Sequence, residues 1–165
     1  MIDCVLREAT TLDVPAITAI YSHYVLTSTA TFEVDAPDTA EMENRLRSIK
    51  EQNLPYLVAE LDGIVVGYGY ASQFRPRPAY GFTVEDTVYV HHGWIGKGVG
   101  RRLMDALISS CRAAGCHQVV AVISGNNSAA VALHASQGFH HVGLMPEVGF
   151  KFRRWVDIVL MQRAL

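Results

Sequence analysis

Residues 90–102 read Val90-His-His-Gly-Trp-Ile-Gly-Lys-Gly-Val-Gly-Arg-Arg102 and form the most informative stretch of the chain. Gly96, Gly98 and Gly100 alternate where an apolar run ends and a helical pattern begins. Glycine lets the backbone approach a ligand closely, and the free N–H groups at a helix N-terminus attract anions. The stretch therefore predicts a strand, a phosphate-binding turn and a helix, with a pyrophosphate as the natural occupant. The alternative is a glycine-rich turn without a ligand.

Two common phosphate-binding motifs do not match this turn. A P-loop requires glycine at position 91 and serine or threonine at position 98, but the chain has His91 and Gly98. A dinucleotide fingerprint that begins at Gly96 requires its third glycine where the chain has Arg101. One that begins at Gly98 requires it where the chain has Leu103. The turn thus belongs to neither class.

Hydrophobic spacing on both sides of the turn predicts a mixed α/β fold. We expect strands near residues 2–7, 56–61, 64–70, 84–91, 118–123, 139–145 and 154–162. We expect helices over 13–28, after Pro37, over 98–114 and through Leu133-His134 as far as Gly138. Asp62-Gly63 between two β-rich runs predicts a hairpin, and Asp38 and Glu41 are spaced as a capping box.

Composition sets limits on the class of protein. The 165 residues include 14 Lys+Arg and 16 Asp+Glu, for a formal net charge of −2. This length fits one domain over residues 1–165, and the charge argues against nucleic acid as a partner. No apolar run approaches the roughly 20 residues that span a bilayer, and the first residues show no apolar signal region. We therefore expect no membrane segment and no export signal.

Cysteine and histidine spacing bears on redox state and metals. Cys4, Cys111 and Cys116 form no CxxC pair, which favours reduced thiols in a cytoplasmic protein. Each His-His pair, at 91–92 and 140–141, would point its rings to opposite faces of a strand. The spacing therefore predicts no metal site.

The glycine turn resembles the Arg/Gln-x-x-Gly-x-Gly turn of the GNAT superfamily of N-acetyltransferases, although Ile95 stands at the Arg/Gln position. Stretches 20–24, 74–80, 83–90, 121–127, 133–139 and 148–152 are similar to the phosphinothricin N-acetyltransferase group. The resemblance implies the GNAT acyl-CoA N-acyltransferase fold, of α/β (α+β) class, with a mostly antiparallel central sheet flanked by helices. It also implies acetyl-CoA as cosubstrate, a small-molecule amino acid as partner and a homodimer with the pocket near its interface.

That group acetylates the amino group of phosphinothricin (glufosinate), methionine sulfoximine or arsinothricin, and so gives resistance to these compounds. The resemblance implies that backbone N–H groups of the strand end and the glycine turn hold the cofactor. The residues are Val88, Tyr89, Val90, Gly96, Lys97, Gly98, Val99, Gly100 and Arg101. Asn127 either caps the following helix or binds the pantetheine arm.

The chemistry requires a proton acceptor, because an α-amino group is mostly protonated at pH 7. Glu85 stands at the position that resembles the group's catalytic glutamate, whereas Asp86 should point to the other face of the strand. The alternative for Glu85 is an ordinary carboxylate facing solvent. His134 takes the place of a tyrosine that many superfamily members use to protonate the departing thiolate. Its alternative is a purely structural role.

Substrate recognition must accommodate a second anionic group. Arg75 and Arg77 lie in a loop between two strands that Pro76 and Pro78 stiffen, and arginine binds carboxylate or phosphinate oxygens in a bidentate manner. The alternative is a solvated basic loop. Phe32 and Glu33 are expected to wall the pocket, with Tyr80, Tyr89 and Lys151 as further candidates and Trp155 in the core. Two hypotheses remain open here: an N-acetyltransferase for such an amino acid or another small amine, and a non-catalytic acyl-CoA-binding module.

Overall fold

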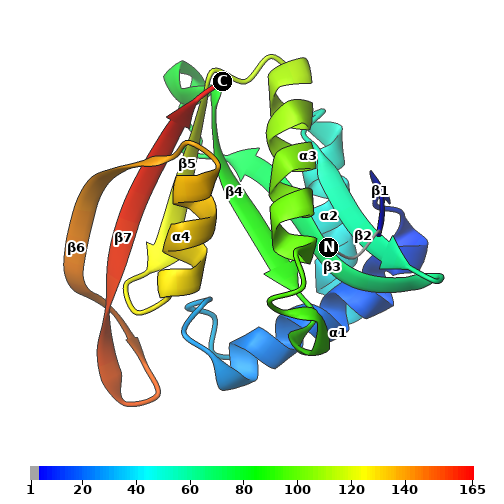
Figure 1. The fold of residues 1–165 in the computed structure, drawn as a ribbon, viewed down its shortest axis with the longest axis horizontal. Coiled ribbons are helices and arrows are strands. Elements are labelled where there is room, and N and C mark those ends of the chain that lie inside the picture. The colour runs from blue at the N-terminus through cyan, green and yellow to red at the C-terminus, as the bar shows by residue number, and fades with distance from the viewer. Residues whose placement is uncertain (1–3) are drawn as a thin grey trace.

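The computed structural model describes residues 4–165, so residues 2 and 3 of the first expected strand lie outside the described residues. Figure 1 shows the helices on the two faces of a strongly twisted sheet. The strands are β1 Val5–Glu8, β2 Tyr56–Leu61, β3 Ile64–Gln73, β4 Thr83–Val90, β5 Gln118–Ser124, β6 His140–Lys151 and β7 Arg154–Ala164. The helices are α1 Val14–Thr27, α2 Thr39–Glu51, α3 Val99–Ala113 and α4 Ser128–Ser136. The predicted order of elements is confirmed.

Within residues 4–165, seven strands form one sheet in the order β1-β2-β3-β4-β5-β7-β6. Neighbouring strands among them run antiparallel except β4 and β5, which are parallel. One apolar cluster joins α1 and α2 to one face of the sheet, and a second joins α3 and α4 to the other. This is the mixed, mostly antiparallel sheet that the resemblance implied. No helix in this part of the chain is long and apolar enough to cross a membrane.

Local signals account for several of these elements. Asp62 and Gly63 have φ of 49° and 79°, the positive values that a type I′ hairpin turn requires. The Asp38 side chain caps α2 by accepting a hydrogen bond from the Glu41 amide at 2.8 Å. The Glu41 carboxylate instead accepts from Arg45 Nε at 2.9 Å, so one half of the expected capping box forms.

The β6–β7 ribbon differs most from expectation. β6 was expected to end near residue 145, but after an irregular register between Met145 and Gly149 it continues to Lys151. At that irregularity Glu147 has a φ of 53°, and its amide donates to Asp157 Oδ1 at 2.9 Å. Trp155, expected in the core, is 62 % exposed and packs beside Phe150. The ribbon is a long, outward-facing edge of the sheet.

Candidate active site

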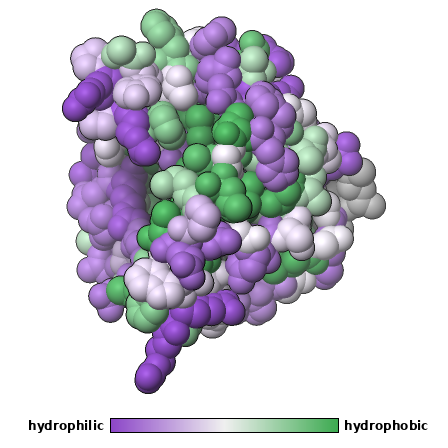
Figure 2. All heavy atoms as spheres, turned by 90° about the vertical axis from the view of Figure 1, so that its left-hand side faces the viewer, coloured by the Kyte–Doolittle hydropathy of each residue, from purple (hydrophilic) through white to green (hydrophobic). Residues whose placement is uncertain are grey.

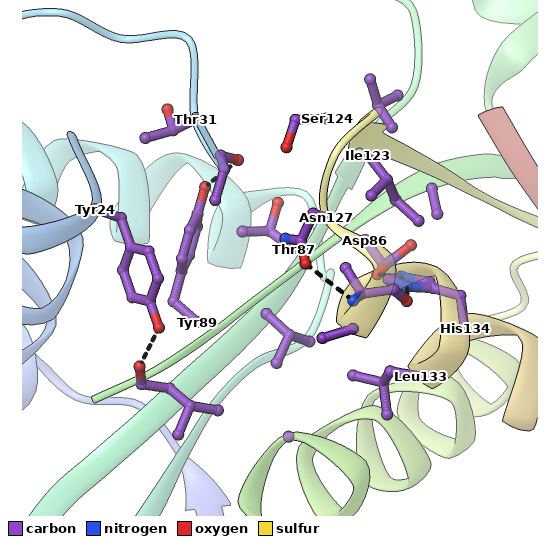
Figure 3. Close-up of a pocket in the computed structure, with 18 of the residues that line it drawn as sticks. Tyr24, Thr31, Asp86, Thr87, Tyr89, Ile123, Ser124, Asn127, Leu133 and His134 are labelled. Carbon is purple, nitrogen blue, oxygen red and sulfur yellow. Dashed lines mark hydrogen bonds and ion pairs between the residues drawn. The ribbon is translucent and has the colours of Figure 1, made fainter. Parts of the chain in front are cut away.

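The site begins where two neighbouring strands separate. β4 and β5 pair over only three positions, from Thr83 opposite Gln118 to Glu85 opposite Val120. Beyond Glu85 the parallel strands diverge, and a cavity of about 700 Å³ lies along the opening. In Figure 3, Tyr24, Tyr89 and Thr31 lie on one side of β4, and Asp86 and His134 lie on the other. The cavity therefore passes through the sheet and has two halves.

The backbone of β4 directs specific amides into this opening. Thr83 O accepts from Phe74 N at 3.1 Å and His91 N donates to Val66 O at 2.9 Å, so odd-numbered positions face β3. The amides of Val88 and Val90 consequently point toward β5, where the strand pairing has ended. The amide of Tyr89 faces β3, and Tyr89, also a candidate for the pocket wall, lines the cavity. Of residues 88–90, only the two valines therefore direct their amides toward the opening.

The glycine turn adopts backbone conformations that favour glycine. Gly96 and Gly98 have φ of 77° and 89°, in the left-handed region where a side chain is strained. Gly98 immediately precedes the 15-residue helix α3, whose first N–H groups are free to bind an anion. Gly96, Gly98, Gly100, Arg101 and Ile95 all line the cavity. These residues fit the pyrophosphate of acetyl-CoA.

Two residues expected in this group lie elsewhere with their side chains. Lys97 Nζ is 4.4 Å from the centroid of the Trp94 ring, and Lys97 is outside the cavity lining. Val99 is 1 % exposed and belongs to the core, so only its backbone amide can serve a ligand. Asn127 lines the cavity and caps α4, because its Oδ1 accepts from Ala130 N at 3.0 Å.

Glu85 lies half-buried on β4 and lines the cavity. Burial raises the pKa of its carboxyl above the ordinary value, and the charge of Asp86 adds to this effect while that of Arg75 opposes it. A carboxylate with a raised pKa is a stronger base and is better matched to accepting a proton from an amine. Glu85 therefore places a carboxyl group with a raised pKa at the mouth of the split.

Asp86 and His134 form a buried pair that sequence reasoning missed. His134 Nε2 lies 2.8 Å from Asp86 Oδ2, and His134 Nδ1 lies 2.7 Å from the carbonyl oxygen of Ala130. Because a carbonyl oxygen only accepts, Nδ1 carries a proton. Burial alone lowers the pKa of His134, but the hydrogen bond and charge of Asp86 outweigh it, and the pKa lies above its ordinary value.

The geometry favours the structural role of His134 over the donation of a proton to the leaving thiolate. Both of its ring nitrogens are engaged, and its ring also packs edge-on against Phe139 at 5.0 Å. The histidine connects α4 to β4 across the split. Asp86 does point away from the face of Glu85, as expected, but sequence spacing could not show its partner 48 residues away.

The expected substrate residues separate into two groups. Phe32 lines the cavity, whereas Glu33 does not. Glu33 Oε1 accepts from Arg45 at 2.6 Å and from the Tyr21 hydroxyl at 2.9 Å, so Glu33 anchors its loop and the prediction that it walls the pocket is wrong.

The arginine loop lies outside the cavity lining. Arg75 is exposed, packs over the Phe74 ring at 4.5 Å and donates to the Phe74 carbonyl at 3.3 Å. Arg77 is also exposed and precedes a short 3-10 turn, Pro78–Tyr80. Arg75 nevertheless acts on Glu85, because its charge lowers the pKa of that carboxyl. Within one chain, these arginines can influence the approach to the site but do not form its wall.

Tyrosines form one wall of the cavity, and only Tyr89 among them was predicted from the sequence as a candidate for the pocket. Tyr21 and Tyr24 of α1 lie 5.3 and 5.0 Å from the ring of Tyr89, between ring centroids. Both line the cavity with Tyr70 of β3. The Tyr24 hydroxyl donates to Val90 O at 2.5 Å and so fixes the strand end (Figure 3). We call this half, lined by these four tyrosines, residues 29–32 and Glu85, the acceptor half.

Among residues 4–165, no group of three or more His, Cys, Asp or Glu side chains is placed to hold a metal ion. The site is that of an acyl-CoA-dependent acyltransferase. It combines a parallel strand pair that separates, a glycine turn at a helix N-terminus and a carboxylate beside the split. The sequence profile of the acetyltransferase (GNAT) family matches residues 17–139, and the chain belongs to this family. It is an acetyl-CoA-dependent N-acetyltransferase.

Named relatives and solved structures support the assignment. A phosphinothricin N-acetyltransferase of Alcaligenes faecalis is 49 % identical over 98 % of this chain and 83 % of its own length. An L-methionine sulfoximine/L-methionine sulfone acetyltransferase of Salmonella typhimurium is 41 % identical over 97 % of this chain and 94 % of its own. The structure of a Sinorhizobium meliloti phosphinothricin acetyltransferase in complex with acetyl-CoA superposes with a TM-score of 0.97. Its identity is 44 %, over 99 % of this chain and 89 % of that one.

Proposed function

We propose that this protein transfers the acetyl group of acetyl-CoA to the α-amino group of phosphinothricin or of a close analogue, methionine sulfoximine or arsinothricin. Two observations support the substrate class: the names of the relatives described above, and an acceptor half that places aromatic rings around a single carboxylate. The observation that carries the proposal is the position of Glu85, half-buried beside the split with a raised pKa.

In the proposed mechanism, the Glu85 carboxylate accepts a proton from the substrate ammonium, directly or through one water. The free amine then attacks the thioester carbon without an acyl-enzyme, and a tetrahedral intermediate forms. When this intermediate collapses, the C–S bond breaks, CoA leaves as the thiolate, and the remaining extra proton on nitrogen passes to that sulfur through water. The amides of Val88 and Val90, directed into the split, donate to the oxygen on which negative charge develops. The helix α3 N-terminus and the glycine turn hold the pyrophosphate and so fix the position of the thioester.

Arg75 and Arg77 have a secondary role in this proposal. Both are exposed cations, and the charge of Arg75 lowers the pKa of Glu85, which supports a role near the acceptor half. A substrate with a carboxylate and a second anionic group would be attracted to that end of the cavity. Arginine would then recognise these groups through bidentate hydrogen bonds.

We also propose that the protein forms a homodimer through the β6–β7 ribbon. Figure 2 shows apolar side chains gathered on the face that carries this ribbon. The exposed fractions include 60 % for Leu144, 57 % for Phe150 and 62 % for Trp155. Contiguous exposed apolar surface of this kind usually marks an interface. We further propose one functional domain over residues 1–165 and a cytoplasmic location, since the three described cysteines are free thiols.

The test is release of the CoA thiol with phosphinothricin, methionine sulfoximine, arsinothricin and a polyamine as acceptors. We expect saturation at low concentration by one of the amino acids and loss of turnover in Glu85→Gln with acetyl-CoA affinity retained. Turnover of the polyamine alone would assign a different small amine. Acetyl-CoA binding with no turnover of any acceptor, and no effect of Glu85→Gln, would identify a binding module instead.

A further inference from the structure

Two residues of the edge strand β6 are buried, whereas the rest of that strand is exposed. β6 is exposed along its length except at Gly149 and Lys151, which are buried. Because these positions are two apart, they face the same side of the strand. What they contact is the loop that follows α1, at Thr31 and Phe32. The edge of the sheet therefore reaches the wall of the acceptor half.

Gly149 is in direct contact with the Phe32 ring. Its backbone is outside the left-handed region, so conformation does not demand glycine at this position. A Cβ placed there would lie 2.2, 2.5 and 2.8 Å from Cε2, Cζ and Cδ2 of Phe32. Such distances are impossible without moving the ring. The absence of a side chain at Gly149 is what allows the Phe32 ring to occupy its place.

Lys151 holds the residue next to that ring. Its ammonium donates to the carbonyl oxygen of Thr31 at 2.8 Å, and the residue is only 4 % exposed. Burial lowers the pKa of this ammonium, and the negative charge of Glu33 opposes that effect. A buried cation is costly unless it is paired, so this contact restrains the loop strongly.

The remaining anchors of the loop lie on either side of Phe32 rather than at it. The Tyr21 hydroxyl lies 2.8 Å from Thr31 Oγ1, and the Tyr89 hydroxyl donates to Ala30 O at 3.3 Å. Glu33 binds Arg45 at 2.6 Å. These bonds hold the loop backbone, whereas the Phe32 ring itself rests on Gly149. Since residues 29–32 line the cavity, the position of this ring sets the dimensions of the acceptor half.

We propose that Gly149 and Lys151 are positioning residues that fix Phe32 as the wall of the acceptor half and thereby determine which amino acids fit. The inference rests on the proposed function for the identity of the acceptor. It assigns part of the substrate specificity to the outermost strand, which is separated from β4 by two other strands.

The test compares Gly149→Ala with Gly143→Ala on the same strand. At Gly143 a Cβ would meet only Leu160 Cδ1 at an ordinary 3.7 Å, so this variant is the matched control. We expect Gly149→Ala to lower kcat/KM for the best amino-acid acceptor by about 10- to 100-fold, mainly through KM. The KM for acetyl-CoA should stay within about twofold, because the cofactor half is not altered. Gly143→Ala should resemble the wild type in both.

A double variant tests the specific contact. In Phe32→Ala the ring is gone, so adding Gly149→Ala should cause no further loss of kcat/KM for the acceptor. Lys151→Met, which removes the Nζ–H donor without introducing a clash, should also raise the acceptor KM. Additive losses in the double variant would overturn the proposal, as would equal losses for acceptor and acetyl-CoA, which indicate a general structural defect.

Hydrogen exchange separates this inference from the proposed function. We expect amides of residues 29–33 to exchange at least about tenfold faster in Gly149→Ala than in Gly143→Ala, whatever the substrate is. If the wild type acetylates none of the acceptors, the proposed function fails, and the exchange result still decides whether β6 holds the loop. Unchanged exchange at 29–33 in Gly149→Ala would overturn the inference even in an active enzyme.

Discussion

Replacing Asp86 with asparagine removes the charge that balances a buried imidazolium. The His134 Nε2–Asp86 Oδ2 distance is 2.8 Å, and the two residues are 7 % and 9 % exposed. A hydrogen bond to a charged group contributes about 1.5–3 kcal/mol, and breaking a buried ion pair costs about 3–5 kcal/mol. Because His134 can release its proton when Asp86 is gone, the lower range applies. We expect Asp86→Asn to lose about 2–3 kcal/mol of unfolding free energy, or roughly 5–10 °C in Tm.

The pH dependence of this loss is the sharper test. The pKa of His134 in the folded protein lies above its ordinary value of 6.5, so folding favours the protonated ring. The stability from this shift is therefore complete below pH 6.5 and is lost as pH rises through the folded pKa. Urea unfolding at about pH 6 and pH 9 should show a larger difference between wild type and Asp86→Asn at the lower pH.

The control for this experiment is Asp105→Asn, the same chemical change at an exposed position of α3. It should alter stability by less than about 0.5 kcal/mol at either pH. Our reasoning would be refuted if Asp86→Asn were as stable as the wild type, or if its loss were the same at both pH values.

Three further variants test the site and the interface. Glu85→Gln should lower kcat by about 10²- to 10⁴-fold in the thiol-release assay, with unchanged acetyl-CoA binding. The rate of the wild type should rise as the pH increases above 4.5, since the pKa of Glu85 is raised. A pH profile that stays flat from 4 to 8 would contradict a base at this position. Gly98→Ala, at a φ of 89°, should cost about 1–2 kcal/mol and weaken acetyl-CoA binding in calorimetry, whereas Gly93→Ala, without a positive φ, should not. Trp155→Lys should give monomers in sedimentation, whereas the control Leu12→Lys, at a side chain that is 89 % exposed, should remain dimeric. Dimers of Trp155→Lys together with monomers of Leu12→Lys would place the interface elsewhere.

Short-range patterns were sufficient for most elements of the fold. The end of α3 just before Gly115 and the Asp62-Gly63 hairpin follow from glycine conformations and side-chain spacing within a few residues. The end of β6 could not be predicted this way. The chain passes Pro146 and Glu147 and then resumes pairing with β7, and that pairing depends on a partner strand rather than on the local pattern.

The same distinction separates the parts of the site. The glycine turn was predicted from sequence because a helix N-terminus is a local property, whereas Glu85 was expected at the site from the resemblance to the phosphinothricin N-acetyltransferase group. The partners of His134 and Glu33 could not be predicted from the sequence, because Asp86 and Arg45 come from other elements.

The alternation of side chains and the placement of glycines were enough to establish the order of the elements, the anion-binding turn and the strand that carries the carboxylate. Contacts between residues tens of positions apart determine the point where β4 and β5 separate, the ring that rests on Gly149 and the carboxylate that pairs with His134. Such contacts form only when the whole sheet and its helices bury their apolar faces together, so no local pattern in the chain records them.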